Sequence, residues 1–205
     1  MLPPLPPATR ALLLINIAVF LLQQVAGATL LKLFALWPPG SGMFQVWQLV
    51  TYGFLHGSWT HIFFNMFALF MFGGMLERLW GARRMLVYFL VCIVAAGLTQ
   101  LAVLAAQTTA PTEGYTIGAS GGVFGVLLAF AWYFPRQRLY VIPIPIPLPA
   151  WLFVTIYGLL ELLFGVTGVQ SDVAHFAHLG GMLGGALCIL YWRARNRFNS
   201  GLPRA

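Results

Sequence analysis

Six long apolar stretches constrain the fold of this chain more than any other feature of its sequence. Each approaches the roughly 20 residues that an α-helix needs to cross the hydrocarbon core of a bilayer. The chain is 60% hydrophobic and only 7% charged, which is far outside the range of an ordinary soluble domain. We therefore expect an all-α membrane protein, a single membrane domain over residues 1–205, with transmembrane helices at about 11–27, 58–76, 84–106, 118–134, 149–166 and 174–192.

The basic residues predict how these helices are oriented. In membrane proteins, Lys and Arg accumulate in cytoplasmic loops near the ends of the spans. In a six-span arrangement all the arginines fall on the side of the membrane that holds both termini, and only Lys32 falls on the other side. Both termini should therefore be cytoplasmic. The net charge of +7 then reflects topology and attraction to anionic membrane lipids, and it requires no nucleic-acid partner. The basic side carries Arg10, Arg78, Arg83, Arg84, Arg136, Arg138, Arg193, Arg195, Arg197 and Arg204.

The first apolar stretch also fits a signal peptide, because Arg10 precedes it and the small residues 26–28 end it like a cleavage site. Cleavage would leave five spans and spoil the alternation of charge, so we expect this segment to remain as a helix. Cys92 and Cys188 both fall within predicted spans. Their position indicates core packing rather than a disulfide or a zinc site.

Three connections between the spans have distinct compositions. Residues 28–57 form a long outer connection rich in aromatic residues, which we expect to lie partly in the membrane interface, where Trp and Tyr are favoured. Residues 107–117 are small and polar and lead directly to Ser120. Proline alternates with apolar residues from Ile142 to Pro149, which predicts a stiff polyproline II connector.

Polar residues concentrate at the beginnings of the second, fourth and sixth spans, which in this topology all enter the membrane from the outer face. His61 and Asn65 open the second span, Ser120 the fourth, and His175 and His178 the sixth. At a rise of 1.5 Å per residue, these side chains would lie about one or two turns below the outer surface. Polar groups at that depth are tolerated mainly in the bundle interior or in a water-filled cavity. We therefore expect a cavity that opens to the outside.

Ser120 and His178 are the candidate nucleophile and general base. Each is followed by glycines spaced four residues apart, a pattern that lets two membrane helices approach closely. His178 shares a helix face with its glycines, whereas His175 lies one turn closer to water. We assign His178 as the base and His175 as an entrance residue or a packing neighbour. None of the four acidic residues is placed by the sequence to orient His178, so the prediction is a Ser-His dyad.

His61 and Asn65 are the candidate donors for an oxyanion hole, together with the backbone N–H of Ser120. Their spacing of four residues puts both on one helix face, and donors aimed at a developing oxyanion are a major source of catalysis. The alternative is a buried pair in which His61 and Asn65 satisfy each other between helices. His56, outside the span, is expected to be an interfacial loop residue.

A metal site is a further alternative, because His175 and His178 form an HxxH pair that His61 could approach. An intramembrane metalloprotease would need His-Glu-x-x-His to supply ligands and a base together, and the sequence has no such motif. We therefore expect neither a metal nor a cofactor.

The ordered set of motifs resembles the rhomboid family of intramembrane serine proteases over nearly the whole chain. The matching elements are the Gly-Ala-Ser-Gly motif at 118–121, the His61-to-Asn65 segment, the Ala-His-Leu-Gly-Gly motif at 177–181, and the segment 73–78 at the inner end of the second span. Two residues depart from the family pattern. Gln48 follows Trp47 where many relatives have Arg, and Phe124 stands where some have Tyr, although its ring can still pack on His178.

The resemblance implies a Ser120–His178 dyad served by His61 and Asn65. It also implies cleavage of single-span transmembrane protein substrates near the outer end of their helices. No organellar presequence is evident, so we expect a bacterial-type plasma membrane. Substrates would enter sideways from the lipid, past a gate in the fifth span formed by Glu161 and the aromatic residues of 151–164. The main rival is a non-catalytic rhomboid-like protein that binds membrane clients. Such relatives typically lose the Ser or the His, whereas this chain keeps both. A transporter or channel would show an inverted repeat, which the sequence lacks.

Overall fold

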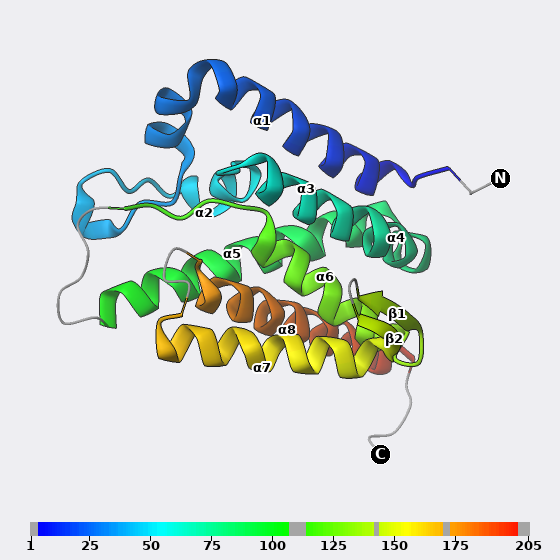
Figure 1. Cartoon of the computed structure of the whole chain (residues 1–205). Coiled ribbons are helices and arrows are strands. Elements are labelled where there is room, and N and C mark those ends of the chain that lie inside the picture. The colour runs from blue at the N-terminus through cyan, green and yellow to red at the C-terminus, as the bar shows by residue number, and fades with distance from the viewer. Residues whose placement is uncertain (1–3, 107–113, 142–143, 170–172, 201–205) are drawn as a thin grey trace.

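A computed structural model describes residues 4–106, 114–141, 144–169 and 173–200 and is predominantly helical (Figure 1). It has a helix in each of the six predicted apolar stretches. Helix α3 continues through the π-helical segment η3 into α4. The bounds are α1 (Pro7–Phe34), α3 (Trp59–Ala68), η3 (Leu69–Gly73), α4 (Gly74–Trp80), α5 (Ala82–Ala106), α6 (Ser120–Tyr133), α7 (Ala150–Thr167) and α8 (His175–Ser200).

Four of these segments are long and apolar enough to cross a membrane, namely α1, the continuous segment Trp59–Trp80, α5 and α7. Helix α6 is equally apolar but has 14 residues. The findings indicate a helical, multi-pass membrane bundle. The crossing of the membrane by α6 and α8, and the cytoplasmic position of both termini, stay predictions.

Helices α1 and α7 lie at opposite edges of the bundle, with α6 and α8 between them (Figure 1). Helix α5 packs against both α6 and α8 and contributes the fully buried side chains Tyr88, Phe89 and Ile93 to the core. The approach of α8 to α5 is very close, because a Cβ atom at Gly180 would lie 2.5 Å from Cβ of Thr99. Gly125 of α6 and Gly185 of α8 also lie against α5, at Cys92 and Tyr88, so the two glycine faces expected from the sequence are shared by three helices rather than two.

Helix α1 is held to α4 by a buried carboxylate. Both Glu77 oxygens point at the first turn of α1, where Oε1 accepts a hydrogen bond from the Ala8 N–H at 2.8 Å and Oε2 accepts from the Thr9 N–H at 2.6 Å. The Thr9 hydroxyl donates a third bond to Oε2 at 2.7 Å. Because the first N–H groups of a helix have no intrahelical partner and carry partial positive charge, an acidic side chain satisfies them well.

The segment from 28 to 57 is only partly the loop that the sequence predicted. Helix α1 continues to Phe34, with non-helical backbone angles at Ala26 that mark a kink. The rest contains the short elements η1 (Pro39–Ser41), α2 (Gln48–Thr51) and η2 (Tyr52–Phe54). The fully buried Gln48 fixes this region, since its amide bonds the backbone at Trp37, Gln45 and Met43. A side chain with both donors and acceptors can thus anchor the segment where the family pattern often has Arg.

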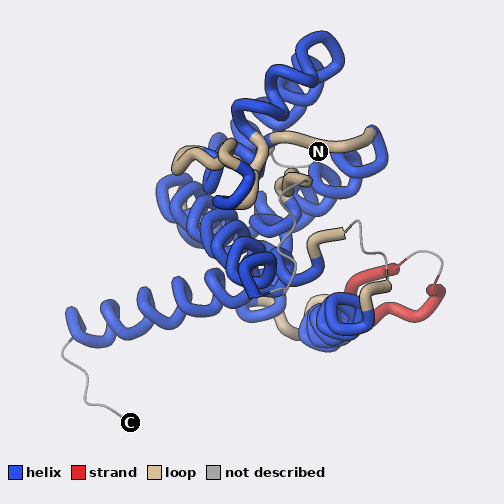
Figure 2. Tube along the Cα trace, turned by 90° about the vertical axis from the view of Figure 1, so that its left-hand side faces the viewer, coloured by secondary structure: helices blue, strands red, loops and turns tan. Residues whose placement is uncertain are grey.

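The proline-rich run forms a β-strand, so the prediction of polyproline II was wrong over its described residues. Strands β1 (Arg138–Val141) and β2 (Ile144–Pro149) pair antiparallel, with Leu139 opposite Leu148. Residues 142–143 of this run lie outside the described residues. In a two-stranded hairpin, one edge of β2 has no neighbouring strand. Proline is tolerated there, because its missing N–H costs no hydrogen bond between strands. Figure 2 shows the hairpin at the periphery, and the last turns of α8 extending beyond the bundle.

Candidate active site

Ser120 begins α6 and faces the second turn of α8. The structure places Ser120 Oγ 2.8 Å from Nε2 of His178, although 58 residues separate them in the chain. His178 is 8% exposed, so its imidazole is largely removed from lipid and from bulk water. A serine hydroxyl at this distance from an imidazole nitrogen can transfer its proton as it attacks a carbonyl.

The contact depends on a very close approach of α6 and α8. A Cβ atom at Gly181 of α8 would overlap the backbone of Gly121 in α6 and lie 2.7 Å from its carbonyl carbon. Real Cβ atoms do not approach backbone atoms so closely, so position 181 needs glycine. Position 121 needs glycine for another reason, because a Cβ atom there would overlap Cβ of Ala96 in α5. Because Gly121 follows Ser120 and Gly181 lies one turn after His178, this crossing sets the distance between hydroxyl and imidazole.

Phe124 stacks on the imidazole of His178. The two ring centroids are 4.3 Å apart and the planes differ by 6°, which confirms the expectation that the ring four residues after Ser120 packs on His178. Phe124 also contacts Tyr157 of α7, and the centroids of these two rings are 4.9 Å apart. The stacked ring restricts the imidazole to one plane, which keeps Nε2 directed at Ser120.

His61 of α3 lies close to Ser120 as well. Its ring contacts Gly118, where a Cβ atom would lie 2.8 Å from Nε2 of His61 and 3.6 Å from Ser120 Oγ, and Gly118 has a φ of +128° that also favours glycine. The Gly57 N–H donates to Nδ1 of His61 at 3.4 Å. The ring proton then resides on Nε2, the nitrogen that lies against Gly118. The arrangement can therefore donate a hydrogen bond beside the nucleophile.

Asn65 is buried on the same helix, and its Nδ2 donates to the backbone carbonyl of His61 at 3.0 Å. The alternative in which the two side chains satisfy each other does not hold, because Asn65 bonds the main chain of His61 and not its ring. The amide has a second N–H, which could donate a hydrogen bond to a substrate oxygen. The oxyanion roles of His61 and Asn65 stay predictions.

Glu161 supplies the carboxylate that the sequence prediction left out. Its Oε2 accepts a hydrogen bond from Nδ1 of His178 at 2.8 Å, so Ser120, His178 and Glu161 form a continuous row. The prediction that no acid is placed to orient His178 was therefore wrong. Sequence spacing gave the depth of Glu161 on α7, but not the rotation of α7 relative to α8, and rotation decides which neighbour a side chain meets.

His175 is a buried partner of the same carboxylate and not an entrance residue. It is 5% exposed, its Nδ1 lies 2.7 Å from Oε2 of Glu161, and its Nε2 lies 3.1 Å from the carbonyl oxygen of Val169. The alternative of a packing neighbour describes it better. Potential metal-ligating atoms of Glu161, His175 and His178 all lie within 4.8 Å of one another. They already satisfy one another by hydrogen bonding, and His61 is not part of this group.

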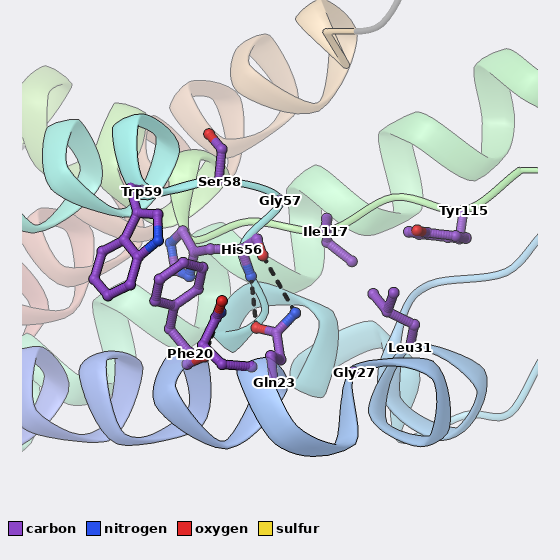
Figure 3. A pocket seen from close by; sticks show the side chains of 11 residues that line it. Phe20, Gln23, Gly27, Leu31, His56, Gly57, Ser58, Trp59, Tyr115 and Ile117 are labelled. Atoms are coloured by element: carbon purple, nitrogen blue, oxygen red, sulfur yellow. Dashed lines mark hydrogen bonds between the residues drawn. The ribbon is translucent and has the colours of Figure 1, made fainter.

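His56 is also buried, at 2% exposure, and the prediction of an interfacial loop residue was wrong. Gln23 of α1 brackets its backbone, accepting from the His56 N–H at 3.0 Å and donating to its carbonyl at 3.2 Å (Figure 3). Burial, and then the neighbouring His61, lower the pKa of His56 to about 3. A cavity of about 430 Å³ lies against it between α1 and the segments 56–59 and 115–117. Neither Ser120 nor His178 lines this cavity.

Comparisons with known proteins place the chain among homologues of one kind. Residues 43–195 match the Rhomboid domain family. The chain is 31% identical to the rhomboid protease GlpG of Photorhabdus laumondii over 194 residues, which is 95% of this chain and 64% of that protein. It is 28% identical to the rhomboid protease GlpG of Yersinia pseudotuberculosis over 192 residues, 93% of this chain and 64% of the relative.

The chain therefore spans less than two thirds of the length of these curated relatives. The matched region nevertheless includes the hydrogen-bonded residues Ser120, His178 and Glu161, and it also includes His61 and Asn65. The family match covers most of the chain, and the alignment with the relatives extends into α1. The chain belongs to the rhomboid family.

Proposed function

We propose that this protein is an intramembrane serine endopeptidase that cleaves single-span membrane proteins near the outer end of their transmembrane helix. The observation that carries the proposal is the 2.8 Å contact between Ser120 Oγ and His178 Nε2 in a chain of the rhomboid family. The named rhomboid protease relatives support the same activity. The enzyme would act as one multi-pass domain of the cell membrane, with both termini cytoplasmic, and would need no cofactor.

The reaction begins when Ser120 Oγ attacks the scissile carbonyl carbon. His178 Nε2 takes the hydroxyl proton during attack and returns it to the leaving amine when the tetrahedral intermediate collapses. The first product then carries the new N-terminus, and the other half remains as an ester on Ser120. A water molecule, deprotonated by the same nitrogen, hydrolyses the ester and regenerates the hydroxyl.

Negative charge develops on the carbonyl oxygen in each tetrahedral intermediate. The Nε2–H of His61, the second Nδ2–H of Asn65 and the backbone N–H of Ser120 are the proposed donors to this oxygen. The Ser120 N–H is available because it belongs to the first residue of α6, whose amides have no intrahelical acceptor. Removing one such donor typically lowers kcat by about 10²–10³-fold.

The substrate must present an extended peptide bond to Ser120. A peptide bond inside a helix has its carbonyl engaged and its faces covered, so segments with small or helix-destabilising residues are the favoured targets. In the proposed topology Ser120, at the beginning of its helix, would lie near the outer surface of the membrane, which favours cleavage near the outer end of the substrate helix.

The deciding experiment reconstitutes the purified protein in liposomes with a generic single-span substrate. The wild type, Ser120→Ala and His178→Ala are compared with a third variant, Thr155→Val, which alters an exposed hydroxyl on α7. Cleavage by the wild type and Thr155→Val, but not by the other two, supports the proposal. Equal cleavage by Ser120→Ala rejects Ser120 as the nucleophile. Binding of the substrate without cleavage by the wild type would favour the alternative, a non-catalytic rhomboid-like protein that binds membrane clients.

A further inference from the structure

Glu161 is an exceptional residue for its position on α7. It is the one charged residue in an 18-residue apolar helix, and it is 5% exposed while its neighbours Leu160 and Leu162 are 39% and 45% exposed. A carboxylate in such surroundings is costly unless its oxygens accept hydrogen bonds. Both bonds that the structure gives it come from α8, so the side chain faces the catalytic helix rather than lipid.

The packing of α7 on α8 brings the carboxylate to that position. Gly158 and Gly165 flank Glu161 on the same face of α7, about one turn away in each direction. A Cβ atom at Gly165 would lie 3.3 Å from Cβ of His175, and one at Gly158 would lie 3.4 Å from Cε of Met182. These small residues let α7 approach α8 at the depth of Glu161, close enough for direct contact with both imidazoles.

The contact with His178 has a defined chemical consequence. Nδ1 donates to Oε2 of Glu161 at 2.8 Å, and Nε2 lies 2.8 Å from Ser120 Oγ on the far side of the ring. An ionised carboxylate only accepts hydrogen bonds, so it fixes the proton on Nδ1 and leaves Nε2 as the acceptor for the hydroxyl. It also places a negative charge beside the imidazolium that forms during attack.

We propose that Glu161 is a positioning residue that selects the reactive tautomer of His178 and stabilises its protonated form, so that the dyad of this chain works as a row of three. The inference rests on the proposed function. Glu161 acts through His178 and touches no substrate. It would transfer no proton itself, and the proton that leaves Ser120 Oγ would reside on Nε2 until the amine departs.

His175 holds the carboxylate in place. Its Nδ1 donates to the same oxygen at 2.7 Å, and its Nε2 lies 3.1 Å from the Val169 carbonyl just beyond the end of α7. The ring thus links the beginning of α8 to both Glu161 and the chain that follows α7. Removing His175 would free Glu161 to rotate, whereas a side chain that keeps a donor at the position of Nδ1 would not.

The test compares Glu161→Gln and Glu161→Ala with Thr155→Val in liposomes. Thr155 is on the same helix, but its hydroxyl bonds only the Trp151 carbonyl. We expect kcat to fall by about 10²-fold or more in both Glu161 variants while KM changes less than about 3-fold, because loss of tautomer control affects the chemical step. His175→Asn, which retains a donor, should keep more activity than His175→Phe.

A second readout does not depend on turnover. In ¹⁵N-histidine NMR of the unliganded protein, His178 should be protonated on Nδ1 in the wild type and should be a mixture of tautomers in Glu161→Gln. Unchanged tautomer populations, a kcat within about 2-fold of wild type, or a loss expressed in KM alone would each overturn the proposal. If Glu161→Ala does not fold, the near-isosteric Glu161→Gln decides. An active wild type with an inactive Ser120→Ala variant would keep the proposed function even where the Glu161 proposal fails.

Discussion

Gly181→Ala tests whether the crossing of α6 and α8 sets the catalytic geometry. The new Cβ would lie 2.7 Å from the carbonyl carbon of Gly121 and 3.0 Å from its Cα. Non-bonded carbon atoms pack best at about 3.5–4.0 Å. Because the opposing atoms are backbone, no side-chain rotation can relieve the overlap, and the two helices must separate by about 1 Å.

The same separation would reach the active site, since Ser120 precedes Gly121 and His178 lies one turn before Gly181. The distance from Ser120 Oγ to His178 Nε2 would grow from 2.8 Å towards about 3.6 Å, at which no hydrogen bond remains. A misplacement of about 1 Å can lower the rate about 10²-fold. Overpacking of this kind also lowers the free energy of unfolding by about 1–3 kcal/mol.

The assay measures kcat for substrate cleavage and the labelling rate of Ser120 by a fluorophosphonate probe, with the thermal unfolding midpoint recorded for each variant. Gly27→Ala is the matched control, because nothing lies within 4 Å of a Cβ atom at Gly27, and it should change neither rate. If Gly181→Ala cleaves and labels within about 2-fold of wild type, the crossing of α6 and α8 does not set the Ser120–His178 distance.

Four other outcomes are expected. Glu77→Ala should lower the free energy of unfolding by about 3 kcal/mol or more, because two N–H groups and a hydroxyl of α1 lose a charged acceptor; an unchanged urea midpoint would contradict this. Phe124→Leu should reduce kcat about 10-fold by releasing the stacked imidazole of His178, and Phe124→Tyr should retain activity. An excess of chelator should leave cleavage unchanged, whereas a metal-dependent enzyme would lose it. Finally, the pKa of His56 is lowered to about 3 in the folded protein, so the unfolded state binds more protons below pH 6.5. Stability should fall by about 2 kcal/mol between pH 6.5 and pH 5, and calorimetry of His56→Phe should show that part of the slope removed.

The sequence predicted those features that depend on one segment at a time. Helix positions follow from apolar length, and the aromatic contact of Phe124 with His178 follows from its place one turn after Ser120. The extension of α1 to Phe34 was missed because aromatic and small residues suggested an interface loop. The hairpin at 138–149 was missed because alternating prolines suggested polyproline II, although an edge strand tolerates proline when its free side faces outward.

Glu161 was missed for a different reason. Its contacts depend on how α7 is rotated and how close it lies to α8, and neither quantity follows from the spacing of residues on α7 alone. A signal was nevertheless present, since a charged residue inside an apolar span, between Gly158 and Gly165 on one helix face, indicates a close polar contact with a neighbouring helix. His56 is a similar case, because burial against Phe20 and His61 comes from tertiary packing of a segment that looks exposed in sequence.

The Glu77 contact with α1 has a consequence for the order of assembly. The amides of Ala8 and Thr9 find their acceptor 69 and 68 residues further along the chain. During synthesis, the first helix therefore enters the membrane with its leading turn still open to water or lipid head groups. It can be locked only after the next apolar segment, Trp59–Trp80, has formed and brought Glu77 to the first turn of α1. Helix α1 is thus synthesised before α4 but acquires this contact only when α4 has followed it.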